Sequence, residues 1–331
     1  MGMLVEGEWL ADDERYRRSD DGAFVRPGSA FRAFVTADGS SGFPAEPRRY
    51  HLYAALSCPW AHRALILRAL KGLEECIPVS IVAPWTHGEG WSFADYPGAT
   101  GDGVNGFANL HEVYRRADQR YTGRVTVPVL WDTHTSTVVS NDSGDIVRML
   151  NSEFDCWVVT RAPDFYPEDL RSEIDCLNER LYRDVNHGVY RAGFAASQAK
   201  YGEAVANVFG ALDQLEELLR TRRYLCGSRI TESDWRLFTT LIRFDAVYYV
   251  HFKCNIRRIA DYPNLMEFAR ELYQWPAVAD TVNFDHIKRH YYTSHQRLNP
   301  GGFVPIGPIQ DFSIPHRRGS ASSWLTAAEY E

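Results

Sequence analysis

The sequence predicts an α/β domain followed by an all-helical domain, a fold class of α/β plus all-α. Short apolar runs of strand type alternate with amphipathic runs over residues 48–152, whereas long helical periodicities dominate residues 165–290. A chain of 331 residues with 45% hydrophobic content can bury two cores of ordinary size. We expect residues 1–47 to form an N-terminal arm and residues 291–331 to form a C-terminal tail.

The arm has no clear period, so we expect an irregular segment that packs on the body of the protein. Its scattered aromatic residues supply the contacts: Trp9, Phe24, Phe31, Phe34 and Phe43.

The α/β pattern begins at Tyr50. It predicts a strand over 51–55, a helix over 59–71 and a second strand over 77–82. A polar and aromatic insertion, about 84–122, contains a short helical pattern at 109–117.

A hairpin is predicted next, from strands over 125–131 and 137–139. A helix then begins near Asp142 and Ser143. This order of elements is that of a thioredoxin-like domain.

The second half predicts only helices, over residues 170–185, 198–219, 234–250 and 265–273. Thr231, with an acidic side chain at Asp234, has the spacing of a capping box and is assigned to folding alone. The tail over residues 299–331 is rich in Pro and Gly, which favours an ordered stretch followed by a mobile terminus.

Composition excludes several classes of function. The net charge of −7 argues against nucleic acid or an acidic membrane surface as a partner. No apolar run reaches the roughly 20 residues that span a bilayer, and the N-terminus lacks a signal peptide, so we expect a cytoplasmic protein. The six cysteines have no metal-type spacing, so we expect reduced thiols and no metal.

Cys58 carries the main chemical prediction. An apolar run ends at Ser57 and an amphipathic run begins at Pro59, so Cys58 lies at a helix N-terminus, where N–H groups favour a thiolate. The position three residues later is Ala61, and without a resolving cysteine there a mixed disulfide at Cys58 needs an external thiol. Glutathione is the obvious candidate.

Two other motifs suit a peptide ligand. Pro128 cannot donate to a sheet, so a cis Val127–Pro128 bond would turn the Val127 backbone toward an extended peptide; a trans proline on an edge strand is the alternative. Asp142 and Ser143, at a helix start, suit the ammonium and carboxylate of a γ-glutamyl group. The alternative for them is a plain helix cap.

Several motifs together resemble one family, the glutathionyl-hydroquinone reductases, which are the xi-class glutathione transferases. The resemblance covers nearly the whole chain, and jointly the motifs are highly specific. They are Ser57–Arg63, Gly123–Asp132, Asn186–Tyr190, Thr231–Phe238, His251–Asn255, His286–His295, Asn299–Pro300 and Val304–Pro308.

The resemblance implies a thioredoxin-like N-terminal domain, an α-helical glutathione transferase C-terminal domain and a homodimer. It implies that Cys58 is catalytic beside a site for glutathione, which acts as co-substrate. The glutathione contacts that it implies are a stacked Trp91, Arg124 on a carboxylate, Val127 and Pro128 on the cysteinyl backbone, and Asp142 with Ser143 on the γ-glutamyl group. The chain departs from the family pattern at Asp142–Ser143–Gly144, where Glu-Ser followed by a small or acidic residue is usual.

Three tyrosines are candidates for the pocket of the aromatic substrate: Tyr190, Tyr291 and Tyr292. A phenolic hydroxyl there could hydrogen-bond the hydroquinone oxygen or supply a proton. The alternative is packing, since the chain has 18 tyrosines.

The expected function is glutathione-dependent reduction of glutathionyl-hydroquinones through a mixed disulfide at Cys58. One alternative is an omega-like thiol transferase or dehydroascorbate reductase. A second, from a different class, is a non-catalytic protein that binds glutathione.

Overall fold

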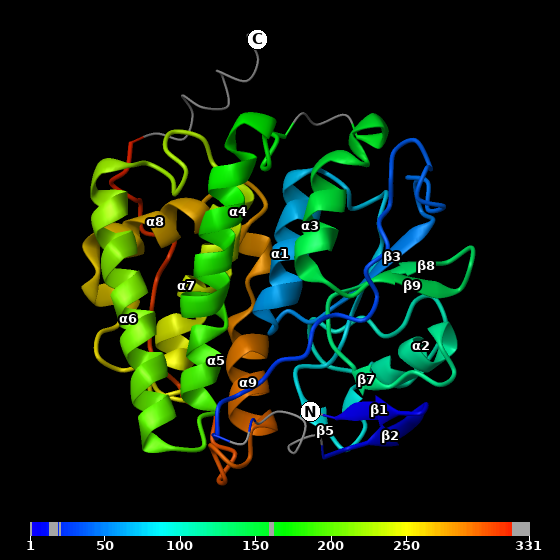
Figure 1. The fold of residues 1–331 in the computed structure, drawn as a ribbon, viewed down its shortest axis with the longest axis horizontal. Coiled ribbons are helices and arrows are strands. Elements are labelled where there is room, and N and C mark those ends of the chain that lie inside the picture. Colours follow the sequence, from blue (N-terminus) through cyan, green and yellow to red (C-terminus); the bar gives the residue numbers. More distant parts are fainter. Residues whose placement is uncertain (1, 13–18, 20, 159–161, 320–331) are drawn as a thin grey trace. The chain divides into compact units, whose positions relative to one another are not determined.

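The computed structural model describes residues 2–12, 19, 21–158 and 162–319, and it divides into two compact units (Figure 1). The first unit comprises Met1–Thr160 and Thr281–Pro305, and the second comprises Arg161–Asp280 and Ile306–Glu331. The helical periodicity predicts that residues up to 290 belong to the helical domain. The structure instead groups the helix α9 (Phe284–Ser294) with the first unit, because its side chains pack on the insertion.

A four-stranded mixed sheet forms the centre of the first unit, in the order β4-β3-β8-β9. The strands are β3 (Tyr50–Ala54), β4 (Val79–Ile81), β8 (Val129–Asp132) and β9 (Thr137–Ser140). β3 and β4 run parallel, so a crossover must join them, and α1 (Pro59–Leu70) supplies it. The other two pairs are antiparallel. The predicted thioredoxin-like order is confirmed.

The helices α1 and α3 (Ser143–Ser152) lie side by side (Figure 1). Ala61 and Ala64 of α1 are fully buried, and their small side chains permit a close approach. Ile146 and Leu150 of α3 are also fully buried. Burial of a large apolar side chain such as Ile146 or Leu150 stabilises the fold by roughly 1.5–3 kcal/mol.

The N-terminal arm is more regular than predicted. A hairpin of β1 (Met3–Val5) and β2 (Glu8–Leu10) pairs with β7 (Gly123–Arg124) in a second sheet, in the order β2-β1-β7. Three-residue strands are too short to show a period, and the partner strand is distant in sequence, so no local pattern reveals the pairing. At the turn, Gly7 has φ +83°, and a Cβ there would lie 2.0 Å from the Gln119 carbonyl oxygen.

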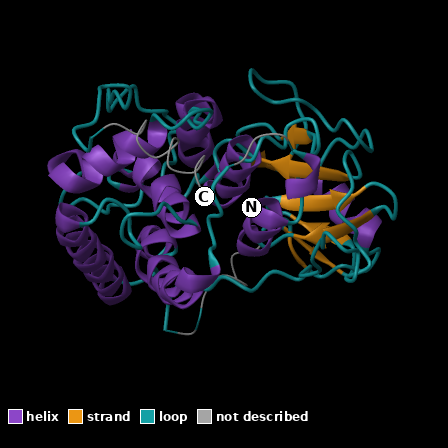
Figure 2. Ribbon diagram, turned by 90° about the horizontal axis from the view of Figure 1, so that it is seen from above, coloured by secondary structure: helices purple, strands orange, loops and turns teal. Residues whose placement is uncertain are grey.

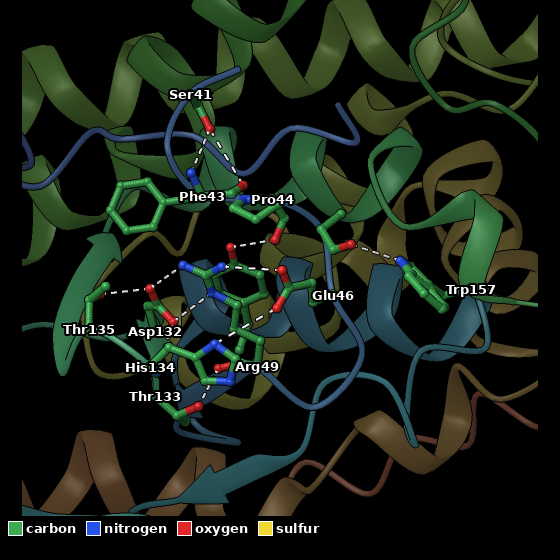
Figure 3. A network of polar contacts seen from close by, with 12 residues as sticks. Ser41, Phe43, Pro44, Glu46, Arg49, Asp132, Thr133, His134, Thr135 and Trp157 are labelled. Carbon is green, nitrogen blue, oxygen red and sulfur yellow. Dashed lines mark hydrogen bonds and ion pairs between the residues drawn. The ribbon is translucent and has the colours of Figure 1, made fainter. Parts of the chain in front are cut away.

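A network of polar contacts joins the end of the arm, through Arg49 just after it, to β8 (Figure 3). Arg49 donates to both carboxylate oxygens of Asp132, at 2.9 and 2.8 Å, and the Asp132 side chain is fully buried. Thr135 also donates to Asp132, at 2.7 Å. The indole of Trp157 donates to the Ala45 carbonyl at 2.8 Å. This segment of the arm is therefore part of the folded core.

The insertion between β4 and β7 contains α2 (Leu110–Ala117), close to the predicted 109–117. It also contains a hairpin of β5 (Thr86–His87) and β6 (Gly90–Trp91) that the sequence analysis did not predict. The predicted strand over 125–131 is shorter in the structure, because β8 begins only after Pro128, at Val129. β7 lies before the predicted range and joins the second sheet.

All the strands in Figure 2 belong to the first unit, and the described part of the second unit is helical. Its helices are α4 (Arg171–Arg180), α5 (Gly188–Gly193), α6 (Gln198–Thr221), α7 (Glu232–Arg243) and α8 (Pro263–Tyr273), with π-helical turns at Leu181–Asn186 and Phe244–Tyr248. The capping box of Thr231 and Asp234 is confirmed.

The C-terminal tail packs along the second unit through polar contacts. The Gln310 amide donates to Asp245 at 2.6 Å, and Arg318 pairs with the fully buried Glu271 at 2.8 Å. The predicted mobile terminus falls at the end of the tail, where residues 320–331 lie outside the described residues. Among the helices that the structure describes, none combines the length and apolar character needed to cross a membrane.

Candidate functional site

Cys58 occupies the N-cap position of α1, directly before Pro59. Its backbone is extended, with φ −81° and ψ 121°, and its carbonyl accepts the first helical hydrogen bond from the His62 N–H at 2.9 Å. The side chain is neither fully buried nor fully exposed. The predicted nucleophile therefore lies where the unpaired N–H groups of a helix begin.

The Val127–Pro128 peptide bond is cis, as predicted. The Val127 carbonyl oxygen lies 3.6 Å from the Cys58 Sγ, although 69 positions separate the two residues in the chain. Val127 precedes the first residue of β8, Val129, whose pairing with β3 begins opposite Tyr53. The structure thus brings together the thiol and the Val127 backbone that the sequence assigned to a peptide ligand.

Asp142 caps α3, and its Oδ1 accepts hydrogen bonds from the N–H groups of Gly144 and Asp145 at 2.9 and 3.2 Å. Burial opposes ionisation of this carboxyl, but the positive charge of Arg32 and the hydrogen bonds to its oxygens hold its pKa below the ordinary value. Asp142 is therefore a carboxylate at neutral pH. The alternative of a helix cap is therefore correct for Oδ1, and Oδ2 takes no part in the cap.

The N-terminal arm reaches Oδ2 of Asp142, a contact that the sequence does not predict. The Ser29 hydroxyl donates to this oxygen at 3.2 Å, and Arg32 approaches it at 3.8 Å. The Phe31 N–H donates to the Asn141 side chain at 3.1 Å. No local signal points from the arm to α3, because these contacts span more than a hundred residues.

Ser143 follows the cap and is buried, with its hydroxyl 3.5 Å from the Arg63 guanidinium. Arg63 also lies over the Trp60 ring, 4.5 Å from its centroid. Arg26 of the arm lies at the same distance from that centroid. Trp60 therefore has two guanidinium groups against it, in the first turn of the helix that carries Cys58.

Trp91, which the resemblance assigns to glutathione stacking, is buried and stacks on His290 of α9. The ring centroids are 4.7 Å apart and the planes make an angle of 18°. The Ser294 hydroxyl, 3.4 Å from His290 Nδ1, accepts a hydrogen bond from the Thr86 N–H at 3.0 Å. These contacts join α9 to the hairpin of the insertion. His290 lies in the motif His286–His295, which contributes to the family resemblance, but its stacking on Trp91 was not predicted.

Tyr291 and Tyr292 are both buried on α9, in the same unit as Cys58. The Tyr291 ring lies 5.1 Å from the ring of His290. Burial raises the pKa of Tyr292 to about 12, so its hydroxyl keeps its proton at neutral pH.

Tyr190 lies in α5, which belongs to the second unit. It lies in an aromatic cluster, with ring centroids 5.3 Å from Phe252 and 5.9 Å from Tyr248. Arg124, in contrast, ends β7 in the first unit and is half-buried. Of the predicted site residues, Tyr190 alone lies outside the first unit.

Comparison with known proteins identifies relatives of the whole chain. Family models match residues 57–153 as "Glutathione S-transferase, N-terminal domain" and residues 193–271 as "Glutathione S-transferase, C-terminal domain". The chain is 52% identical to the glutathionyl-hydroquinone reductase YqjG of Escherichia coli, over 96% of this chain and 98% of that protein. It is 50% identical to the glutathionyl-hydroquinone reductase PcpF of Sphingobium chlorophenolicum, over 94% and 97% respectively.

Comparison with solved structures leads to the same group of proteins. The glutathione-bound structure of YqjG superposes with a TM-score of 0.88, over 95% of this chain and 98% of that chain, at 50% identity. A xi-class transferase from Natrialba magadii superposes with a TM-score of 0.90, over 96% of each chain, at 46% identity.

Proposed function

The chain belongs to the xi-class glutathione transferases, the glutathionyl-hydroquinone reductases, and we propose that Cys58 is the nucleophile with which it reduces glutathionyl-hydroquinones to hydroquinones. The supporting observation is the 3.6 Å between the Cys58 Sγ and the Val127 carbonyl oxygen. A glutathione that pairs in extended form with the Val127 backbone presents its sulfur beside this thiol. Asp142 and Ser143 are proposed to hold the γ-glutamyl end.

In the first step, the Cys58 thiolate attacks the sulfur of the glutathionyl-hydroquinone. A sulfur–sulfur bond forms and the bond from sulfur to the ring carbon breaks. The ring keeps the electron pair, takes a proton and leaves as the reduced hydroquinone. Cys58 remains as a mixed disulfide with glutathione.

In the second step, a second glutathione attacks the glutathionyl sulfur of the mixed disulfide. Oxidised glutathione leaves and the Cys58 thiolate is restored. All six cysteines are free thiols, and the residue three places after Cys58 is Ala61, so an external thiol is the expected resolving group. The expected kinetics are ping-pong.

We propose Tyr190, Tyr291 and Tyr292 for the aromatic substrate, as donors to its oxygen or to the departing ring. The pKa of Tyr292, raised by burial to about 12, supports a proton-donating role because the phenol stays neutral. Phenylalanine variants test this, since they retain the ring and remove only the hydroxyl. If a tyrosine acts as a donor, its phenylalanine variant should have a lower kcat and a stability near that of the wild type.

Mass spectrometry tests the covalent step directly. After exposure to a glutathionyl-hydroquinone, the wild type should carry one glutathione on Cys58 and lose it when fresh glutathione is added. Cys58→Ala should lack both adduct and turnover, whereas Cys156→Ala, which removes an exposed thiol of the same unit, should behave as the wild type. Comparable reductase activity in Cys58→Ala would exclude the mechanism.

Substrate comparison separates the alternatives. Faster turnover of hydroxyethyl disulfide or dehydroascorbate than of glutathionyl-hydroquinones would favour an omega-like thiol transferase. Binding of glutathione with no turnover of any of them would favour a non-catalytic protein.

We also propose that the protein is a homodimer in the cytoplasm. Light scattering tests the oligomeric state, and cell fractionation tests the location.

A further inference from the structure

The side chain of Trp9, in β2 of the arm, packs against the turn of the hairpin formed by β5 and β6 (Figure 1). Its indole N–H donates to the Gly88 carbonyl oxygen at 2.9 Å, across 79 positions of the sequence. A Cβ at Gly90, which has φ +78°, would lie 2.6 Å from Cη2 of the indole. So close an approach requires glycine at position 90, and the ring therefore rests directly on the backbone of this turn.

The indole of Trp9 also stacks on His111 of α2, with the ring centroids 4.8 Å apart and the planes at an angle of 24°. Nε2 of His111 lies 3.0 Å from a carboxylate oxygen of Glu89, the residue between the two glycines. Trp9 thus holds three consecutive residues of the turn, two of them directly and the third through His111. The next residue in the chain is Trp91.

The same arm hairpin is attached to β7. β1 pairs antiparallel with β7, and Met3 lies opposite Arg124. Among the described strands, β6 and β7 belong to different sheets, so strand pairing alone does not fix one relative to the other. The arm hairpin contacts both. It therefore connects the segments that carry Trp91 and Arg124, two residues that the resemblance assigns to glutathione.

We propose that Trp9 is a positioning residue for glutathione binding, which holds the hairpin of β5 and β6 so that Trp91 stays in the glutathione site. This inference rests on the proposed function and on the assignment of Trp91 to that site. Each strand of the hairpin has only two residues, and an isolated two-stranded hairpin is marginally stable at best. A hairpin held in place before the ligand arrives avoids the entropic cost of ordering it on binding.

Titration calorimetry of the whole reduced chain with glutathione tests the proposal. Trp9→Ala should raise Kd about fivefold, since the loss of one aromatic pair has an effect of this order. Trp9→Phe keeps a ring against His111 and loses the N–H donor, so its Kd should lie between those of the wild type and Trp9→Ala. The matched control is Glu6→Gln, because Glu6 belongs to the same arm hairpin and its carboxylate pairs with the exposed Arg120. This variant should keep the wild-type Kd.

A double-mutant cycle separates positioning from a general effect on the fold. Trp91→Ala should also raise Kd. Addition of Trp9→Ala to it should raise Kd by less than about twofold more, because Trp9 then has no indole to position. Circular dichroism and the melting temperature establish that each variant is folded. Trp91→Leu completes the cycle if Trp91→Ala is unfolded, and Trp9→Phe replaces Trp9→Ala in the same case.

The contrary outcomes are distinct. A wild-type Kd in folded Trp9→Ala would overturn the inference, and so would effects that multiply in the double variant, because they would show that Trp9 does not act through Trp91. An equal rise of Kd in Glu6→Gln would assign the effect to the arm hairpin as a whole and overturn the role of Trp9.

Failure of the underlying assignments is visible separately. A wild-type Kd in Trp91→Ala would remove Trp91 from the glutathione site, and the inference with it. Absence of any adduct on Cys58 in the wild type would overturn the proposed function itself, whatever the Kd of the Trp9 variants.

Discussion

The Ser29 hydroxyl donates to the Oδ2 of Asp142 at 3.2 Å, which joins the N-terminal arm to the N-cap of α3 across 113 positions of the sequence. A second contact of the same hydroxyl, to the Asn141 carbonyl oxygen at 3.3 Å, strengthens this junction. The arm therefore sets the direction of the carboxylate that is proposed to meet the ammonium group of glutathione.

Removal of this junction should weaken binding of the glutathionyl group. In Ser29→Ala we expect KM for the glutathionylated substrate to rise roughly 2- to 13-fold, the equivalent of a net hydrogen bond of about 0.5–1.5 kcal/mol, with little change in kcat. Steady-state kinetics measure both quantities. Ser40→Ala is the control, because its hydroxyl bonds Asp38 within the arm. An unchanged KM would show that Ser29 does not act through Asp142.

The stacking of His290 on Trp91 predicts a positioning role for the histidine. His290→Ala should raise KM for glutathione several-fold, since an aromatic pair contributes about 0.5–1.5 kcal/mol beyond its buried area. His290→Phe retains a ring against the indole and should recover most of the affinity. The exposed His134 provides a control by substitution to Ala. Equal defects in His290→Ala and His290→Phe would assign the role to the imidazole nitrogens instead of the stack.

The buried pair of Arg49 and Asp132 should dominate the stability of the contact between β8 and the segment that leads into β3. Arg49→Ala leaves a fully buried carboxylate without its bidentate partner, and we expect a loss of about 3–5 kcal/mol in the free energy of unfolding. The adjacent Arg48 pairs with Glu75 on the surface, so Arg48→Ala should cost less than about 1 kcal/mol. Urea denaturation measures both. Similar losses in the two variants would contradict the assigned role of burial.

The buried His51 predicts a loss of stability in mild acid. Burial lowers the pKa of His51 to about 4, despite the opposing charge of Asp102, while the unfolded chain titrates near 6.5. Between these values the unfolded state binds a proton that the folded state does not, so stability falls as pH decreases from 6.5 to 4. The contribution is roughly 3 kcal/mol. Above pH 6.5 it is constant.

Denaturation at a series of pH values checks this expectation. The profile of His51→Gln should be flatter than that of the wild type between pH 6.5 and 4, whereas the profile of the exposed His87→Gln should match the wild type. His251 of the second unit has its pKa lowered to about 4 by burial in the same way, so His251→Gln provides an independent case. Parallel profiles in all these proteins would refute the assignment.

The sequence by itself determined the order of elements and the main chemical groups. The proline at position 59, the apolar run before Cys58 and the helical periodicity from residue 165 are local signals, and the structure confirms the elements that they predict. The capping box at Thr231 is local as well. Each depends on the conformational preferences of a few consecutive residues, so a short window of sequence suffices.

Only the tertiary structure decided what those groups meet. The arm hairpin pairs with β7, Ser29 reaches Asp142, His290 stacks on Trp91, and Arg26 comes to lie on Trp60. These contacts join residues that are far apart in the chain, and chain reversals, packing and the burial of charge select them together. No periodicity in the sequence predicts these contacts, because the free energy that stabilises them comes from the assembled core and not from any one segment.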